Sequence, residues 1–202
     1  MNKDYMRGEV LSAQYLLQKN QVYLFGVVET GMAATIIPQM HYIDQKMIDD
    51  GIPEDQRILT LLINSPGGSV SDGLAIYDTI NSLRCEVRTI CVGLAASMGA
   101  FLLSSGSKGM RCALPNSEIL IHQPLGGAQG QASDIIIAAK HIERTRGTLN
   151  RVLAMNTGKT VEQIAADTDR DYTMTAEEAL SYGLIDHILV PQRIKATGGR
   201  II

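Results

Sequence analysis

Short apolar runs with strand character alternate along this chain with longer stretches whose apolar residues recur at helical spacing. The pattern predicts strands at residues 22–28, 58–63, 87–92, 110–113, 118–122 and 185–189. It predicts helices at residues 33–49, interrupted around Pro38, and at 70–83, 97–105 and 133 to about 157. Two more helices begin at capping boxes, TVEQ at 160–163 and TAEE at 175–178, and the second ends near Gly183. Repeated strand–helix units indicate an α/β architecture with a parallel sheet.

The composition is that of one folded domain, and it excludes several classes of function. The chain has 202 residues, of which 45% are hydrophobic, and a formal net charge of −3. No Pro-, Gly- or Ser-rich linker divides it, so residues 1–202 are expected to form a single domain. Neither disorder nor a nucleic-acid-binding surface is predicted. Because no apolar run reaches the roughly 18 residues of a membrane span and no apolar leader is present, we expect a cytoplasmic protein, or one in an organelle interior.

The three cysteines, Cys85, Cys91 and Cys112, do not indicate a metal site or a disulfide framework, because they are too few and wrongly spaced. An odd number of cysteines in apolar surroundings suits a reducing compartment. We therefore expect no bound metal, and cysteines that serve as small core residues.

The segment GLAASMGA at residues 93–100 places one serine where a strand pattern gives way to a helix pattern. Ser97 is therefore expected near a helix N-terminus, where the helix dipole and free N–H groups stabilise developing negative charge. A nucleophile fits this position. The simpler interpretation is a helix N-cap without chemistry, which is the commoner role of an isolated serine.

Two other polar residues stand at the ends of apolar elements. His122 follows the apolar run at 119–121 and precedes Gln123-Pro124, which places it at a strand end. Asp171 lies in the charged run DRDY at 169–172, between two helices. Each also has a plain interpretation, a buried histidine with one bonded nitrogen and a solvated loop. Taken together, a serine, a histidine and a carboxylate in three loops are what a nucleophile, a base and an orienting acid require.

A glycine turn supplies a candidate oxyanion hole. The apolar strand at 58–63 runs into NSPGGS, where Gly67 and Gly68 permit positive φ and close backbone approach. Alone, this turn is a weak signal, since it could simply join a strand to a helix. With Ser97 as nucleophile, the Gly68 N–H becomes a candidate oxyanion donor beside the Met98 N–H.

Read together, these segments resemble the proteolytic subunits of Clp proteases, which are self-compartmentalised serine peptidases. The resemblance covers roughly residues 22–189 and rests on four stretches in the family's order and spacing: INSPGGSV (63–70), AASMGAFLL (95–103), ALPNS (113–117) and IHQPLGG (121–127). It is poor before Val22 and between His41 and Arg57, so residues 1–21 are treated as a variable N-terminal segment. The triad order Ser…His…Asp and Ala95 in place of a glycine argue against an α/β-hydrolase esterase.

The resemblance implies a role for each matched residue. Ser97 is implied as the nucleophile, His122 as the general base and Asp171 as the orienting carboxylate, with Gly68 and Met98 giving the oxyanion hole. Pairing with an extended polypeptide substrate is implied at Val70 and Leu125. The implied fold is the crotonase-like β-superhelix of ββα units with a protruding handle, here at about residues 123–157.

The resemblance also implies an assembly: two stacked heptamers, fourteen subunits in all, fed by a hexameric Clp ATPase, with ATP used by that partner and no cofactor in this chain. The residues of the long helix agree, because III at 135–137 followed by two alanines puts apolar side chains on every side of the helix. A second subunit would cover them; burial within one domain is the alternative.

Two other functions stay open from the sequence. One is a poorly active or structural subunit in a mixed Clp ring beside a second proteolytic subunit. The other is a crotonase-type enzyme acting on acyl-CoA thioesters. Relatives also commonly carry aromatic residues at positions matching Thr60, Leu62, Ser82 and Cys112, where ATPase loops bind. Without these aromatics or compensating neighbours, we expect weak ATPase binding by this subunit alone.

Overall fold

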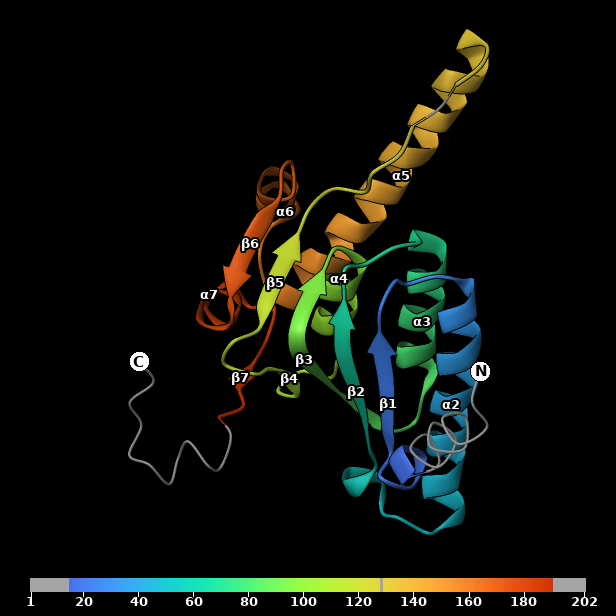
Figure 1. Cartoon of the computed structure of the whole chain (residues 1–202), viewed down its shortest axis with the longest axis vertical. Helices are drawn as coiled ribbons and strands as arrows, with labels where there is room; N and C mark the ends of the chain where they lie inside the picture. The colour runs from blue at the N-terminus through green and yellow to red at the C-terminus, as the bar shows by residue number, and fades with distance from the viewer. Residues whose placement is uncertain (1–14, 128, 191–202) are drawn as a thin grey trace, which may run out of the picture.

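A seven-stranded, mostly parallel sheet forms the centre of the computed structural model, which describes residues 15–127 and 129–190. Hydrogen bonds join the strands in the order β1-β2-β3-β4-β7, and β5 pairs with β3 and with β6 (Figure 1). The strands are β1 (Gln21–Phe25), β2 (Ile58–Ser65), β3 (Glu86–Ala96), β4 (Arg111–Ala113), β5 (Glu118–Ile121), β6 (Tyr172–Thr175) and β7 (His187–Ile188). The α/β class with a parallel sheet, expected from the alternating pattern, is confirmed.

The long strand β3 belongs to two parts of the sheet. Its residues 89–91 pair with β4, and its residues 94–96 pair with β5. Gly93 lies between the two sets with a φ of +97°, and the register with β2 shifts at the same level. The prediction that this strand ends at Val92 is therefore wrong by four residues, because a glycine in the left-handed region bends the strand without ending it.

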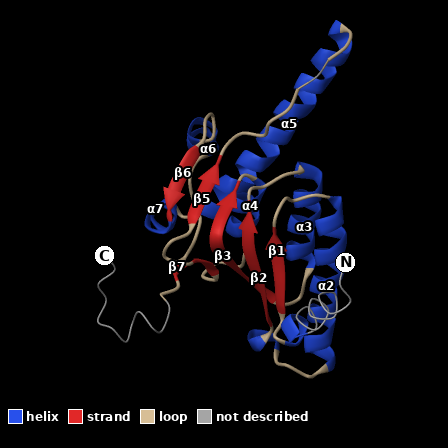
Figure 2. Cartoon of the chain, in the orientation of Figure 1, coloured by secondary structure: helices blue, strands red, loops and turns tan. Residues whose placement is uncertain are grey.

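Helices cover the sheet and extend beyond it (Figure 2). α2 and α3 pack on each other, and α2 also contacts β1 and β2. The short α4 contacts β2, β3 and β5, and all seven of its residues are buried. The helices are α2 (Thr30–Asp49), α3 (Val70–Ser82), α4 (Met98–Ser104), α5 (Ala132–Thr157), α6 (Val161–Asp167) and α7 (Ala176–Tyr182), with a 3-10 turn at Glu54–Gln56. Among the helices of the described ranges, none has the length and apolar character needed to cross a membrane.

Helix α2 corrects two expectations. It begins at Thr30 and continues without interruption through Pro38 to Asp49. Its buried side chains, Ala33, Ile36, Met40, Ile43 and Met47, form one stripe at helical spacing, so packing on both sides of the proline outweighs the lost hydrogen bond.

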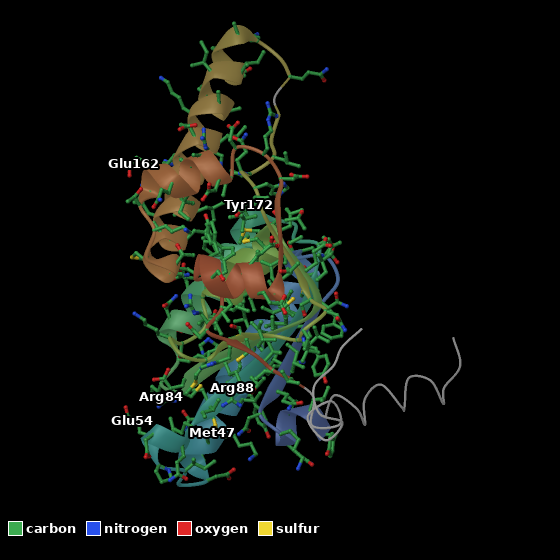
Figure 3. All side chains as sticks on the ribbon, turned by 90° about the vertical axis from the view of Figure 1, so that its left-hand side faces the viewer. Met47, Glu54, Arg84, Arg88, Glu162 and Tyr172 are labelled. Carbon is green, nitrogen blue, oxygen red and sulfur yellow. The ribbon has the colours of Figure 1, made fainter. Side chains whose placement is uncertain are left out.

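The poorly matching stretch between His41 and Arg57 contains the last part of α2 and the 3-10 turn that follows it. There Asp44 is buried and accepts hydrogen bonds from the backbone N–H groups of Arg84 and Cys85, at 3.1 and 3.0 Å. Figure 3 shows Met47 and Arg84 at one end of the molecule, far from Tyr172.

Strand β6 was not expected from the sequence. The charged run DRDY indicated a loop between two helices, whereas Tyr172–Thr175 pairs antiparallel with β5. The capping boxes on either side are confirmed: the hydroxyls of Thr160 and Thr175 accept from the N–H groups of Gln163 and Glu178 at 3.2 Å each. Strand β6 could not be predicted because four residues between two strong helix signals are too few to show an alternating pattern.

Helix α5 projects from the rest of the chain (Figure 1). Its 26 residues match the predicted helix closely, and it ends at Gly158, whose φ of +76° terminates the helix. Only its second half is buried, at Leu149, Asn150, Val152, Leu153 and Ala154. In its first half Ile135, Ile136 and Ile137 are exposed by 43%, 55% and 66%, so the described part of this chain does not cover them.

A buried ion pair joins β4 to the segment before β7. The Nε and Nη2 atoms of Arg111, a residue with 5% exposure, donate to Asp186, and its Nη1 donates to the Asn156 carbonyl at 2.7 Å. Burial by itself raises the pKa of Asp186, but the hydrogen bonds and charge of Arg111 and the Gly109 N–H outweigh it, so this pKa lies below its ordinary value.

The three cysteines are free and buried, as expected of small core residues. Burial raises the pKa of Cys85 to about 12 and that of Cys91 to about 11. These thiols therefore stay protonated at neutral pH and are poor nucleophiles.

Candidate active site

Ser97 occupies a strained turn between β3 and α4. Its φ of 54° and ψ of −119° lie in a region that side chains rarely adopt. Such strain is also found where a nucleophilic serine sits at a sharp strand-to-helix turn. Ser97 stands at the N-cap of α4, but its side chain makes no capping hydrogen bond. The position matches the N-cap interpretation, whereas the hydroxyl does not perform that role.

Small residues and one backbone hydrogen bond hold this turn. The Ser97 N–H donates to the Leu120 carbonyl at 2.8 Å, which ties the turn to β5. At Gly99 a β-carbon would fall 2.9 Å from the Ser65 carbonyl oxygen, so only glycine lets α4 approach the end of β2 this closely. Gly99 of the AASMGA motif is therefore required by packing next to the serine.

Strand register brings the three expected triad residues together. Ala96 is paired with Leu120 in the parallel β3–β5 ladder, so Ser97 lies at the level of Ile121. Ile121 is paired with Tyr172 in the antiparallel β5–β6 ladder, so the next residue, His122, faces Asp171. The Nδ1 atom of His122 lies 3.0 Å from Oδ1 of Asp171. Nε2 is the nitrogen left to serve a hydroxyl.

The loop that presents Asp171 is fixed at both ends. On one side Gln123 donates from its backbone N–H to the Thr168 carbonyl at 2.6 Å and from its side chain to the Asp169 carbonyl at 2.9 Å. These bonds hold the acid segment against the histidine segment. They matter because the Asp171 side chain itself is 73% exposed.

On the other side, Tyr182 connects both ends of the same loop. Its hydroxyl donates to Asp167 at 2.7 Å, and its ring meets that of Tyr172 edge-on, with centroids 5.7 Å apart. The Lys159 ammonium lies 4.1 Å from the centroid of the Tyr182 ring. Burial, followed by the bond to Asp167, raises the pKa of Tyr182 well above its ordinary value, so the hydroxyl remains a donor.

The glycine turn reaches the serine through Gly67. A β-carbon at Gly67 would fall 2.6 Å from the Ser97 β-carbon and 3.0 Å from the Met98 nitrogen. The backbone of Val28 bonds to the residues on both sides of Gly68. Its N–H donates to the Gly67 carbonyl at 2.8 Å, and its carbonyl accepts from the Ser69 N–H at 2.7 Å. Met98 is the first residue of α4, where an N–H has no acceptor within its helix. Met98 therefore directly follows Ser97, whereas in the glycine turn it is Gly67 that approaches the serine and Gly68 that contacts Val28.

Two adjoining depressions surround these residues. Val70 and Leu125, the expected substrate-binding residues, line one groove together with Leu74, Pro124 and Ile142. A second cavity opens beside it between β5, α4 and the inner half of α5. It is lined by Val70, Ser97, Met98, Phe101, Ile121, His122, Pro124, Leu149, Asn150 and Leu153.

Several of these contributors were missed by sequence analysis. Gln123, Tyr172 and Tyr182 position Asp171 through contacts across β5, β6 and α7, which no short motif shows. Asn150 reaches the cavity from a helix whose sequence indicated only assembly. The capping box before Tyr182 and the Gln next to His122 were the available signals, and neither indicated a contact partner.

The comparison with known protein families agrees with this geometry. The family model described as Clp protease matches residues 6–192. The chain belongs to the Clp protease family. It is therefore a Clp-type protease, and its relatives generally work with Clp ATPases in oligomeric rings. The match includes all the residues that form the candidate site.

Proposed function

We propose that this chain is a serine endopeptidase, the proteolytic subunit of an ATP-dependent Clp protease that cleaves unfolded polypeptides to short peptides. The observation that carries the proposal is the strand register, which sets His122 beside Asp171 and a strained Ser97 at the level of Ile121, the residue before His122. A metal-free acyl transfer needs these three groups and an oxyanion hole, and no cofactor in this chain.

In the proposed mechanism the Ser97 hydroxyl attacks the peptide carbonyl while His122 Nε2 takes its proton. Asp171 accepts from His122 Nδ1, which keeps the proton on that nitrogen in the resting ring and stabilises the imidazolium that forms. The N–H groups of Gly68 and Met98 bind the oxyanion. His122 then protonates the leaving amine, and water releases the acyl group by the reverse sequence.

The proposed substrate is an extended polypeptide. The groove between Val70 and Leu125 would hold the backbone, and Leu125 is 84% exposed, as a residue that pairs with a substrate strand requires.

Two stacked heptameric rings are the proposed assembly, with α5 as the handle and a crotonase-like superhelix as the subunit fold. Support comes from the exposed isoleucines of the outer half of α5, which an adjacent ring would cover. The interior of such a chamber would restrict cleavage to polypeptides threaded in by a Clp ATPase. A cytoplasmic location follows from this proposal.

For ATPase binding, the sequence predicts a weak interaction because aromatics are missing at four positions. In the structure an aromatic residue, Tyr23, is paired with Leu62 in the β1–β2 register. Tyr23 and Phe25 are exposed by 38% and 43%, with ring centroids 4.9 Å apart. An apolar surface therefore exists next to Leu62, and we propose that this subunit binds its ATPase without needing a second subunit type.

The test is hydrolysis of short fluorogenic peptides by the purified assembly, comparing the wild type with Ser97→Ala. We expect the substitution to abolish turnover and to leave the oligomer unchanged. Turnover close to the wild-type rate in Ser97→Ala would remove the serine from its role. No turnover in the wild type with a full assembly would favour the structural-subunit alternative. Hydration of an enoyl thioester would favour the crotonase-type alternative.

A further inference from the structure

The carboxylate of the proposed triad lies on a segment, residues 167–172, that is called the acid segment below. The Asp171 side chain is 73% exposed, and among the described residues its side chain has one partner, His122, at 3.0 Å. Residues 169–171 are all exposed. The position of the carboxylate therefore depends on how the two ends of the acid segment are held.

Tyr182, the last residue of α7, contacts both ends of the acid segment. Its hydroxyl donates to Asp167 at 2.7 Å, where α6 ends. Its ring meets the ring of Tyr172 edge-on, with centroids 5.7 Å apart, where β6 begins. One such contact would let the segment rotate about a single point, whereas two contacts with the same side chain fix both ends.

Tyr182 is itself held in the packed part of the chain. It is 8% exposed, and the Lys159 ammonium lies 4.1 Å from the centroid of its ring. The next residue, Gly183, has a φ of +95°, and a β-carbon there would fall 2.6 Å from the Thr157 carbonyl oxygen. Only glycine therefore lets α7 end this close to the end of α5. The Tyr182 ring is a fixed point to which the acid segment is attached.

We propose that Tyr182 is a positioning residue for Asp171, whose carboxylate it holds at His122 by fixing both ends of the acid segment. The inference rests on the proposed peptidase function and deepens it. Tyr182 lines neither the groove nor the cavity beside Ser97. Its loss should therefore lower kcat and leave KM unchanged, because a misplaced catalytic group slows the chemical step and does not alter substrate binding.

The first measurement is steady-state hydrolysis of a fluorogenic peptide by the wild type and by Tyr182→Phe, which loses only the hydroxyl. We expect kcat to fall about tenfold, less than the roughly 10²-fold typical of a 1 Å misplacement, because the ring contact with Tyr172 remains. Tyr42→Phe, at an exposed position on α2, is the matched control and should keep the wild-type kcat. A kcat for Tyr182→Phe within about twofold of the wild type would overturn the role.

Two variants of Asp167 test the hydrogen bond itself. Asp167→Ala removes the acceptor and should reproduce the loss in Tyr182→Phe, and the two changes together should cost no more than either alone. Asp167→Asn keeps a carbonyl oxygen that can accept, so it should restore most of the wild-type kcat. Additive losses in the double variant would overturn the shared role. The Asp167 pair also provides the reading if Tyr182→Phe fails to assemble.

A third measurement separates positioning from a general structural role. In an Asp171→Asn background, Tyr182→Phe should not slow fluorophosphonate labelling of Ser97 any further, because the carboxylate through which it acts is already absent. A further loss as large as that in the wild-type background would show a structural role and overturn the positioning role alone. Absence of any Ser97-dependent hydrolysis in the wild type would overturn the proposed function, and this inference with it.

Discussion

The two halves of α5 are built from similar apolar residues, but their surroundings are opposite. Leu149, Val152 and Leu153 of the inner half are exposed by 8% or less, and they form part of the cavity wall beside Ser97 or pack next to it. Ile135 to Ile137 of the outer half are exposed by 43% to 66%. The inner half has its partners within the chain, so the site is built by intrachain packing. The isoleucines of the outer half are not covered by the described residues, and in the proposed assembly an adjacent ring would cover them.

The largest effect should come from breaking the site next to the inner half. Asp171→Asn keeps the side-chain shape but cannot hold the correct imidazole tautomer, and we expect kcat for peptide hydrolysis to fall by about 10⁴-fold. The measurement is steady-state kinetics on an assembly of unchanged mass. A loss below about tenfold would mean that another acceptor orients His122. Asp169→Asn, two residues earlier, is the control, since only its carbonyl contacts Gln123.

A second substitution should lower the free energy of unfolding without altering the proposed triad. Asp186→Asn removes the carboxylate partner of buried Arg111, and breaking a buried ion pair typically costs about 3–5 kcal/mol in the free energy of unfolding. Urea unfolding at a fixed subunit concentration measures it. Asp50→Asn, which breaks an exposed pair with Lys46, should have a much smaller effect.

The difference in the free energy of unfolding between the wild type and Asp186→Asn should depend on pH, and the direction of that dependence follows from the pKa of Asp186. The pKa of Asp186 is lowered in the folded chain, so its contribution is complete above its unfolded pKa of about 3.9 and is lost as pH falls through the lower folded value. The wild type and Asp186→Asn should therefore differ most at neutral pH and converge in acid. A difference that grows in acid would contradict the ion-pair account.

A charge on the outer half of α5 should act on assembly alone. We expect Ile136→Glu to split the double ring into smaller species, because an exposed isoleucine that packs against another subunit cannot be replaced by a carboxylate without loss. Light scattering gives the mass. Lys140→Glu, at an exposed polar position of the same helix, should keep the wild-type mass. Equal masses for both variants would show that the outer half is not an interface.

The positions of the site residues could be predicted from the sequence, but the contacts that position them could not. Ser97, His122 and the glycine turn all follow apolar strands, so their positions at one end of a parallel sheet could be predicted from periodicity. The pairing of His122 with Asp171 could not, because it depends on β6, a four-residue strand next to a charged run. The resemblance supplied the role of Asp171, and the register supplies its geometry.

The misjudged elements share one physical cause, which is tertiary packing that overrides a local signal. Pro38 indicated a break, but a continuous buried stripe keeps α2 intact. Gly93 indicated a strand end, but β3 continues into a second pairing with β5. The burial of Asn150 could not be predicted from the pattern of its own helix, because it depends on packing against α4 and β5, which are distant in sequence.

The most direct test of the account is to find which residue a fluorophosphonate modifies. The probe should react with the wild-type assembly, and peptide mass spectrometry should place the adduct on Ser97, because the proposed mechanism gives that hydroxyl a base and an oxyanion hole. Ser97→Ala should remain unmodified, and His122→Ala should react far more slowly. An adduct on any other serine, or equal labelling of Ser97→Ala, would contradict the assignment of the active site.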